Sequence, residues 1–346
     1  MPSTTCAAIS LAAITSNLAV VRKTAPHSKV MAVIKADAYG HGLVPVATHL
    51  DDVDGFGVAR LNEAQVLRND GITQSITLLG GFLDAIEMHS AEELKLDAVV
   101  HSPHQLALLK EQHFTGGIWV KVNSGMNRLG FPIDALPKVL DALASHNVVG
   151  IMSHLASADT DREYTQQQID TFLGGAASFG LPLSLANSAG ILDYPDSHLD
   201  WVRPGLMLYG VSPFADQRTQ LTPAMTLSAP VIAINNVRAG EKVGYGGAWT
   251  ADKVSRVAVL ATGYADGYPR EITAPVLLGG QRRLLAGRIA MDMTCIELHD
   301  TDQVAVGDQV VLWGGQLPIE EVAELAGTIP YTLMCHVASR VTRRYV

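Results

Sequence analysis

Short β-rich runs alternate with longer helical segments over the first two thirds of this 346-residue chain. Between the runs, apolar residues recur at the helical spacing of 3.6 residues. Several runs are apolar throughout, as expected for parallel strands buried on both faces. The pattern predicts strands at Val30–Lys35, Gly55–Val58, Ile76–Leu79, Asp97–Val100, Ile118–Val122, Val148–His154, Leu183–Ala186 and Met207–Tyr209. The clearest helical segments are Asn62–Arg68, Gln105–Glu111, Ile133–Ser145 and Arg162–Phe179.

Eight strands, each followed by a helix or a long loop, are typical of an α/β fold of the (β/α)8 TIM-barrel type, which occupies about 200 residues. The alternative is a doubly wound open sheet. Such a sheet often carries a glycine-rich phosphate loop after its first strand. No G-x-G-x-x-G or G-x-x-x-x-G-K-[ST] motif stands at that place in this chain, and this favours the barrel.

The pattern changes near Leu221–Pro230, which predicts a second domain. Strand-like runs then follow at closer spacing, at Val231–Val237, Val257–Thr262 and Val310–Trp313, with glycine-rich turns between them. One short helix is expected at Ile319–Ala326. We therefore divide the chain into a barrel, residues 1–230, and a mainly-β C-terminal domain, residues 231–346. Residues 1–10 are candidates for pairing with the second domain.

The N-terminal segment is apolar, but its first basic residues are Arg22 and Lys23. A secretory signal needs a positive region before its apolar run. A short strand and a helix capped near Ser10 are therefore expected here. Three cysteines without a C-x-x-C motif are typical of a reducing compartment. No uncharged apolar run reaches the roughly 20 residues that span a bilayer. These observations predict a cytoplasmic protein with no membrane partner.

Composition narrows the possible partners. Hydrophobic residues make up 48% of the chain and charged residues 17%, so a large buried core is expected. The formal net charge is −9. Nucleic-acid binders normally carry a basic stripe or a basic balance. The one basic cluster here is Arg340, Arg343 and Arg344 at the C-terminus. We expect no nucleic-acid partner.

Lys35 closes an apolar strand in the stretch MAVIKADAYGHG, Met31 to Gly42. In a barrel, a lysine at the C-terminal end of a strand points into the active-site mouth. Burial lowers the pKa of an amine, and a neutral amine can form a Schiff base with a carbonyl such as that of pyridoxal phosphate. A strand-end lysine that reaches solvent is the alternative. Tyr39 and the nearby glycines favour the first interpretation, because they suit a loop around a phosphate.

The stretch K-A-D-A-Y-G-H-G resembles the cofactor-lysine motif of alanine racemases. Those enzymes use pyridoxal 5'-phosphate and consist of a barrel and a β domain. Further stretches match the family in order along the chain: SGMNRLG (124–130), SHLASAD (153–159), ANSAGIL (186–192), VRPGLMLYG (202–210), VGYGGAW (243–249), GYADGYPR (263–270) and GRIAMD (287–292). The resemblance implies a cytoplasmic isomerase that interconverts L- and D-alanine and supplies D-alanine for bacterial peptidoglycan synthesis.

The resemblance also implies the residues that bind the cofactor. The phosphate would be held by Tyr39, Ser188, Gly205 and Leu206, in line with the tendency of barrels to bind phosphate after strands seven and eight. Arg203 would face the pyridine nitrogen. Arginine only donates hydrogen bonds, so this nitrogen would stay unprotonated and side reactions would be limited. His154 would support Arg203. A surface ion pair for Arg203 and a satisfied core histidine for His154 are the alternatives.

Racemisation removes a proton from one face of the substrate Cα and returns one on the other, so two bases are the simpler design. The resemblance assigns these roles to Lys35 and to Tyr245 of the VGYG motif. Tyr245 lies in the second domain, which implies a homodimer with a shared active site. A phenol with a pKa of about 10 needs nearby cations to act as a base. The alternative is a stacking tyrosine in a glycine-rich turn.

Four more positions follow from the resemblance. Arg128 would lie near the cofactor's phenolic oxygen and the substrate carboxylate, which suits a bidentate guanidinium. Met291 would contact substrate from the partner subunit, and Tyr264 would line the access route. Lys121 matches a lysine that is carbamylated in many members of the family. Carbamylation would turn this cation into an anion able to fix Arg128; an unmodified lysine beside a carboxylate is the alternative.

One position departs from the family pattern. Ser339 precedes Arg340 and Val341, where many members carry a tyrosine and another branch carries serine. The departure bears on the preference for alanine over serine, and a serine or broad-specificity racemase is therefore a second hypothesis. A non-catalytic carrier of pyridoxal phosphate is a third, although such proteins are typically a barrel alone. A decarboxylase would be expected to place an acid at the position of Arg203.

No metal site is expected. His101 and His104 have the i, i+3 spacing of a ligand pair, but the sequence offers no third ligand.

Overall fold

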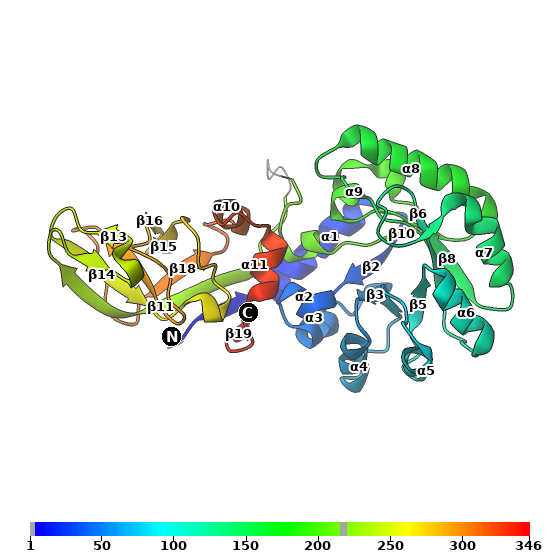
Figure 1. Cartoon of the computed structure of the whole chain (residues 1–346), viewed down its shortest axis with the longest axis horizontal. Coiled ribbons are helices and arrows are strands. Elements are labelled where there is room, and N and C mark those ends of the chain that lie inside the picture. The colour runs from blue at the N-terminus through cyan, green and yellow to red at the C-terminus, as the bar shows by residue number, and fades with distance from the viewer. Residues whose placement is uncertain (1–3, 215–219) are drawn as a thin grey trace.

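The computed structural model describes residues 4–214 and 220–346. Two units lie side by side, a barrel surrounded by helices and a smaller unit made mostly of strands (Figure 1). Residues 1–3 and 215–219, which belong to the expected barrel domain, lie outside the described residues. The expected division after residue 230 falls inside one long strand, β11 (Met225–Val237).

Within the described residues, eight parallel strands close into a barrel, which confirms the predicted fold and shows that the open sheet is wrong. The strands pair in the circular order β2, β3, β4, β5, β6, β8, β9, β10, and the pairings of β5 with β6 and of β10 with β2 complete the circle. Their bounds are β2 Lys29–Val33, β3 Gly55–Val58, β4 Ile76–Leu78, β5 Asp97–Val100, β6 Ile118–Asn123, β8 Val148–Met152, β9 Leu183–Ser184 and β10 Trp201–Val202. The two-residue strand β7 (Phe131–Pro132) pairs with β6 outside this circle.

The eighth predicted strand is wrong. Met207–Tyr209 lies in a 3-10 turn, Leu206–Tyr209, and the barrel is closed instead by β10, whose Trp201 pairs with Lys29 and with Ser184. All four residues of the turn are buried. A short apolar run that is buried all round carries no periodicity, so the sequence alone does not separate a strand from a buried turn. The segment Gly205–Leu206 therefore follows strand eight, as a phosphate loop of a barrel does.

Helices connect the strands on the outside of the barrel (Figure 1). They are α1 Leu11–Thr24, α2 Lys35–Tyr39, α3 Leu43–His49, α4 Leu61–Asn69, α5 Ala85–Glu93, α6 Pro103–Glu111, α7 Leu136–Ala142, α8 Arg162–Ala176 and α9 Ser188–Asp193. The predicted cap of α1 is confirmed, because the Ser10 hydroxyl accepts a hydrogen bond from the Ala13 N–H at 3.2 Å. Two helices are shorter than predicted: Ile133–Ala135 and Ala177–Phe179 form 3-10 turns beside α7 and α8.

A small apolar cluster, Met31, Val99, Trp119 and Met152, packs apart from the main core, and each member lies on a barrel strand. The Trp119 ring meets Trp201 edge to face, with the ring centroids 5.8 Å apart. Gly150 makes room for this ring, since a Cβ there would lie 2.4 Å from it. These apolar side chains therefore pack against one another between barrel strands.

The smaller unit is built around β11. One end of β11 pairs with β1 (Cys6–Ile9) and β18 (Gln309–Trp313), and the other end pairs with β14 (Ser255–Leu260). The remaining strands are β12 Lys242–Val243, β13 Trp249–Thr250, β15 Val276–Leu278, β16 Gln281–Arg283, β17 Thr294–Leu298 and β19 Thr342–Tyr345. The three predicted strands lie within β11, β14 and β18, apart from the last two residues of Val257–Thr262.

The unit contains the predicted helix, α10 (Ile319–Leu325), and a second one, α11 (Pro330–His336), which we did not predict. A seven-residue helix is too short to show a clear apolar period, although Pro330 stands at the start position that proline favours. β1 pairs with β11 and, in parallel, with β19, so the two ends of the chain lie side by side in this unit (Figure 1). No helix in the described part of the chain has the length and apolar character to cross a membrane.

Candidate active site

Lys35 begins an unusual turn at the end of β2. Residues Ala36–Tyr39 all have φ between 52° and 55°, and Gly40 follows at 79°, so α2 is one turn of left-handed helix. The left-handed conformation costs a residue with a side chain roughly 1 kcal/mol or more. Backbone hydrogen bonds hold the turn, among them Gly40 N–H to the Ala36 carbonyl at 3.0 Å. We call residues 35–40 the Lys35 turn.

Contacts from outside also hold the Lys35 turn. The Glu63 carboxylate accepts hydrogen bonds from the N–H groups of Ala36 at 2.6 Å and of Ala59 at 2.8 Å. Helix α11 packs so closely on the other side that a Cβ at Gly40 would lie 2.1 Å from the Met334 carbonyl oxygen. Only glycine fits there. The strain of the turn is therefore offset by its surroundings, and the position of Lys35 is fixed.

Burial lowers the pKa of Lys35, and the positive charge of Arg128 lowers it further. Glu63 acts in the opposite direction but does not cancel the two. A lowered pKa increases the fraction of neutral amine at physiological pH, and the neutral amine is the form that attacks a carbonyl or takes a proton. The structure thus supports the interpretation of Lys35 as a functional lysine over that of an ordinary strand-end lysine.

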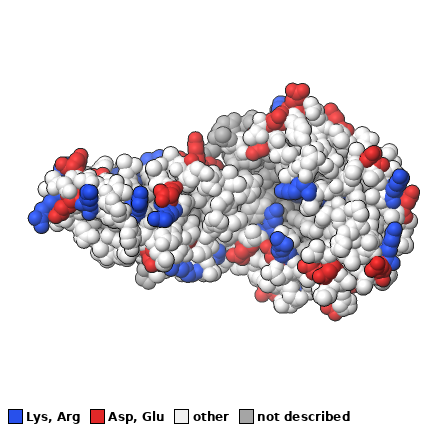
Figure 2. Space-filling model, in the orientation of Figure 1, with Lys and Arg blue, Asp and Glu red and all other residues white. Residues whose placement is uncertain are grey.

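A cavity of about 440 Å³ opens where the barrel strands end, and Lys35 lines it. Lys and Arg side chains gather around the hollow where the barrel meets the smaller unit (Figure 2). Nine of the predicted site residues line this cavity: Lys35, Tyr39, Lys121, Arg128, His154, Ser188, Arg203, Gly205 and Leu206. No Asp or Glu is among its described lining residues. The charges that line the cavity therefore favour the binding of an anion.

One end of the cavity is a close-fitting polar cradle. The Ser188 hydroxyl accepts hydrogen bonds from the N–H groups of Gly205 and Met207, both at 3.2 Å. The Tyr39 hydroxyl lies over Gly205, where a Cβ would be only 2.5 Å away, so a larger residue would displace it. The hydroxyls of Tyr39 and Ser188, the second held in place by these backbone N–H groups, offer hydrogen-bond donors to a phosphate-like group. Tyr39 is itself wedged between the rings of Tyr209 and Tyr331.

Arg203 is buried, and hydrogen bonds hold its guanidinium in place. Its guanidinium donates hydrogen bonds to the Ser184 hydroxyl, to the carbonyl of Ser153 and to that of Leu185. His154 Nδ1 lies 3.4 Å from the same group. Burial lowers the pKa of Arg203 to about 10, which still leaves it positive at neutral pH. The interpretation of Arg203 as a surface ion-pair partner is therefore wrong.

The surroundings of His154 and Lys121 are strongly positive. The pKa of His154 is lowered well below its usual value, first by burial and then by Arg203 and Lys121, so the imidazole is neutral. Burial and the charges of Arg203, Arg128 and Lys35 lower the pKa of Lys121 to about 7. No carboxylate pairs with Lys121 among the described residues, so the alternative of a lysine held by a carboxylate finds no support. We call Lys35, Lys121, Arg128 and Arg203 the cation cluster.

Tyr245, Tyr264 and Met291 do not join this cavity within one chain. All three lie in the smaller unit, and their exposed fractions are 72%, 41% and 53%. Tyr245 stands in a 3-10 turn (Tyr245–Gly247) after a glycine with φ of 72°. Tyr264 begins another such turn, Tyr264–Asp266. Exposed aromatic and thioether side chains of this size suit contact with another molecule.

We did not predict three lining residues of the cavity that have polar side chains, namely Arg60, Asn187 and Tyr331. Arg60 follows β3, and its place after a barrel strand was a usable signal. Asn187 caps α9 by accepting a hydrogen bond from the Gly190 N–H at 3.0 Å, which also places Ser188. Tyr331 comes from α11, far along the chain, and nothing in the local sequence indicates that it reaches the barrel. Its ring centroid lies 5.9 Å from that of Tyr39.

His101 and His104 bind backbone carbonyls through Nε2, those of Gly80 at 3.1 Å and Leu83 at 2.6 Å. Within residues 4–214 and 220–346, no three His, Cys, Asp or Glu side chains are grouped so that they could hold a metal ion.

The barrel carries a strained lysine turn, a cradle for a phosphate-like group and a cluster of cations. These features define a barrel protein that binds an anionic, carbonyl-bearing cofactor. Comparison with known proteins identifies the family. The profile of the alanine racemase N-terminal domain matches residues 9–213, and that of the C-terminal domain matches residues 224–345. The chain belongs to the alanine racemase family.

Individual relatives agree with this assignment. Alanine racemase of Nitrosococcus oceani is 47% identical, over 97% of this chain and 98% of its own length. The crystal structure of the biosynthetic alanine racemase from Pseudomonas aeruginosa superposes with a TM-score of 0.94 at 42% identity, covering all of both chains. The alanine racemase from Bartonella henselae, with covalently bound pyridoxal phosphate, superposes with a TM-score of 0.92 at 28% identity and also covers both chains completely.

Proposed function

We propose that this chain interconverts L- and D-alanine with pyridoxal 5'-phosphate held at Lys35. The observation that carries the proposal is the cation cluster, which lines a cavity without any described carboxylate in a member of the alanine racemase family. Four basic groups at close range repel one another when they are protonated, unless anions separate them. A phosphorylated cofactor and an amino-acid carboxylate supply such anions.

The residues present fit this cofactor. Lys35 would bind its aldehyde, and Tyr39, Ser188, Gly205 and Leu206 would hold its phosphate in the cradle. Arg128 would lie at its phenolic oxygen, and Arg203, supported by His154, at its ring nitrogen. When bound, pyridoxal phosphate withdraws electrons from the substrate Cα and makes the Cα proton acidic.

Arg203 favours a racemase over a decarboxylase. The guanidinium has donors only, and its partners Ser184, Ser153 and Leu185 fix its plane. It can donate a hydrogen bond to the ring nitrogen but cannot release a proton to it at neutral pH. An acid at this place would protonate the nitrogen and strengthen electron withdrawal. Arg203 would keep the withdrawal weak and so limit the chemistry to exchange of the Cα proton.

Two bases would serve the two faces of the Cα. The Lys35 amine would take or return the proton on one face, helped by its lowered pKa. Tyr245 would serve the other face from a second copy of the chain, since its exposed side chain does not reach the cavity of its own barrel. Met291 and Tyr264 of that copy would contact substrate and line its access route, and Arg128 would bind the substrate carboxylate. We therefore propose a homodimer with shared active sites.

The proposal is tested by racemase assays on the purified protein with added pyridoxal phosphate. L-Alanine and L-serine are offered separately and formation of the D-enantiomer is followed. Fast turnover of alanine and slow turnover of serine are expected. Strong turnover of serine would favour the serine or broad-specificity racemase and direct attention to Ser339. No turnover of either, with cofactor bound, would contradict the proposal and favour a non-catalytic carrier.

A carbamate at Lys121 belongs to the same proposal. Its amine nitrogen would attack carbon dioxide, release one proton and become an anion that the charges of Arg203 and Arg128 stabilise. Only the neutral amine reacts, and with a pKa of about 7 roughly half of Lys121 is neutral at pH 7, against a trace of an ordinary lysine. We expect carbon-13 bicarbonate to give a carbamate signal in NMR spectra that grows from about pH 6 to pH 8.

The matched control for this signal is Lys121→Ala, which should remove it, while Lys138→Ala should leave it unchanged because Lys138 is exposed on α7. A signal that survives in the Lys121→Ala protein, or one that first grows near pH 10, would contradict the proposed carbamate.

We further propose that the enzyme works in the bacterial cytoplasm and that its D-alanine supplies peptidoglycan synthesis. Its three cysteines are free, as is usual in a reducing compartment.

A further inference from the structure

Two segments of the smaller unit lie against each other and carry two of the exposed residues. The first is residues 263–267, the Tyr264 turn, and the second is residues 290–293, the Met291 segment. The N–H of Tyr264 donates to the Ala290 carbonyl at 3.1 Å, and the N–H of Ala265 donates to the Met291 carbonyl at 3.0 Å. A Cβ at Gly263 would lie 2.3 Å from both carbonyl oxygens, so only glycine permits this approach.

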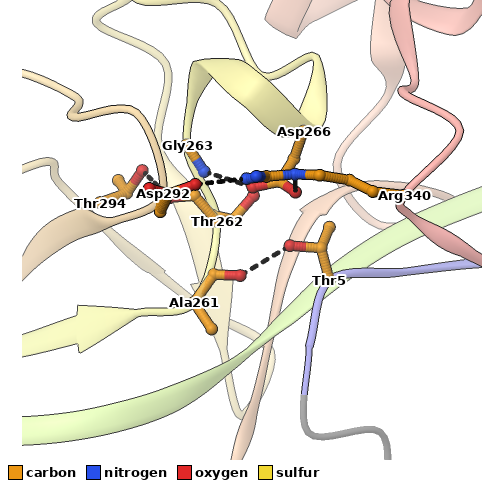
Figure 3. Close-up of polar contacts among 8 residues, drawn as sticks. All are labelled: Thr5, Ala261, Thr262, Gly263, Asp266, Asp292, Thr294 and Arg340. Carbon is orange, nitrogen blue, oxygen red and sulfur yellow. Dashed lines mark hydrogen bonds and ion pairs between the residues drawn. The ribbon is translucent and has the colours of Figure 1, made fainter.

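Arg340 bridges the two segments from the C-terminal part of the chain (Figure 3). Its Nε donates to Asp266 Oδ1 at 2.7 Å, and one terminal nitrogen donates to Asp292 Oδ1 at 2.8 Å. The other oxygen of Asp266 accepts a hydrogen bond from the Gly263 N–H at 2.8 Å. One planar guanidinium thereby fixes the distance and the angle between the Tyr264 turn and the Met291 segment.

The strands that enter these segments are anchored separately. The Thr5 hydroxyl donates to the Ala261 carbonyl at 2.7 Å, and the Thr294 hydroxyl donates to the Thr262 carbonyl at 2.8 Å (Figure 3). The Ala338 N–H donates to the Asp266 carbonyl at 3.1 Å. None of these bonds involves the Arg340 side chain, and we expect loss of that side chain to leave them in place. The loss frees the carboxylate of Asp292, which is exposed, and leaves that of Asp266 with the Gly263 N–H.

We propose that Arg340 is a positioning residue, which holds Tyr264 and Met291 in the geometry that the active site of a second copy requires. The proposal rests on the proposed function and goes beyond it, because Arg340 touches neither substrate nor cofactor. Tyr264 and Met291, one on each of the two bridged segments, have exposed side chains. The bridge orders the two segments before the subunits associate. Less conformational entropy is therefore lost when the second copy binds and when substrate binds.

The other arginines of the C-terminal cluster have different surroundings. Arg343 donates to the carbonyls of Gly40 at 2.9 Å and Val337 at 3.2 Å, so it holds the Lys35 turn of its own chain. Arg344 is exposed on β19, and its side chain makes no hydrogen bond or ion pair with the described residues. Arg344 is therefore the matched control for Arg340, four positions along the same segment.

The test compares Arg340→Met with Arg344→Met in the full-length enzyme loaded with cofactor. We expect Arg340→Met to raise the KM for alanine by about tenfold, with kcat within about threefold of wild type and unchanged cofactor absorbance. Arg344→Met should leave all three unchanged. Arg340→Lys should resemble Arg340→Met, because one ammonium group does not span two carboxylates as the planar fork does. A lower fraction of active enzyme with an unchanged KM would show a purely structural role and overturn the proposal.

A second readout does not depend on catalysis. Amide hydrogen exchange of Tyr264 and Ala265 reports the contact between the two segments. Exchange there should be faster by about tenfold in Arg340→Met and unchanged in Arg344→Met. Asp292→Ala should give the same increase, since it removes the acceptor of the Arg340 hydrogen bond. The double variant should add little, because both changes break one bridge. Equal exchange in all variants would overturn the proposal even if racemase activity were normal. An inactive wild type with these exchange differences would contradict the proposed function and not the bridge.

Discussion

Replacing Lys35 by alanine should abolish racemisation and the visible absorbance of bound pyridoxal phosphate together. Lys35 is both the group that would hold the cofactor covalently and one of the two proposed bases. The other lysine among the described lining residues, Lys121, lies on a different strand, β6, and we do not expect it to replace Lys35. We expect activity to fall by a factor of about 10⁴ or more, as for a residue that combines covalent and acid–base roles. Absorbance spectra and the alanine assay measure the two effects.

Two controls make this result specific. Lys138→Ala removes an exposed lysine from α7 and should change neither spectrum nor activity. A small primary amine added to the Lys35→Ala protein should restore part of the activity, since it can occupy the space that the side chain leaves. If the Lys35→Ala protein keeps the wild-type spectrum, Lys35 does not bind the cofactor.

Replacing Tyr245 by phenylalanine should have the second largest effect, a loss of about 10² to 10⁴ in kcat, since it removes one of two acid–base groups. L- and D-alanine are mirror images, so their equilibrium constant is one. The values of kcat/KM in the two directions must therefore stay equal in every variant. The asymmetry should show instead in solvent-deuterium exchange, with one enantiomer exchanging its Cα proton much faster than it is racemised. Equal and small effects from both enantiomers would exclude Tyr245 as a base.

Mixing the two inactive variants tests where Tyr245 acts. If each site takes Lys35 from one chain and Tyr245 from the other, a mixed dimer of Lys35→Ala and Tyr245→Phe contains one intact site. Random reassociation should then restore about a quarter of the wild-type activity, because half of the dimers are mixed and each has one good site. If the site lies within one chain, no site is intact and the mixture stays inactive. The exposed position of Tyr245 on the smaller unit leads us to expect restoration.

Much of the fold could be predicted from the sequence because the barrel repeats one local pattern. Seven of the eight strands were placed to within a few residues, since runs such as Gly55–Val58 and Asp97–Val100 are apolar and bounded by helical segments. The eighth was misplaced because Leu206–Tyr209 is equally apolar but turns. Helix α11 was missed because seven residues do not establish a period.

The site residues, like the strands, could be predicted only where a local pattern marks them. Lys35, Tyr39, Ser188 and Gly205 stand at or after strand ends, and barrel topology brings strand ends together, so their convergence on one cavity followed from the sequence pattern and the family resemblance. Tyr331 comes from the C-terminal unit and was not predictable, because only the packing of α11 on the Lys35 turn carries it to the barrel. Glu63, on α4 of the barrel, was not predicted either, because only the folded chain brings its carboxylate to the N–H of Ala36.

The sequence by itself determined the class of fold and the family and led us to propose Lys35 as the cofactor lysine, since these depend on local periodicity and on contiguous motifs. Tertiary structure alone decided the left-handed form of the Lys35 turn, the low pKa of Lys121 and the bridge from Arg340 to Asp266 and Asp292. Each of these arises from burial or from contact between groups far apart along the chain. Burial and distance in space set electrostatic energies, and neither quantity can be read from the order of residues along the chain.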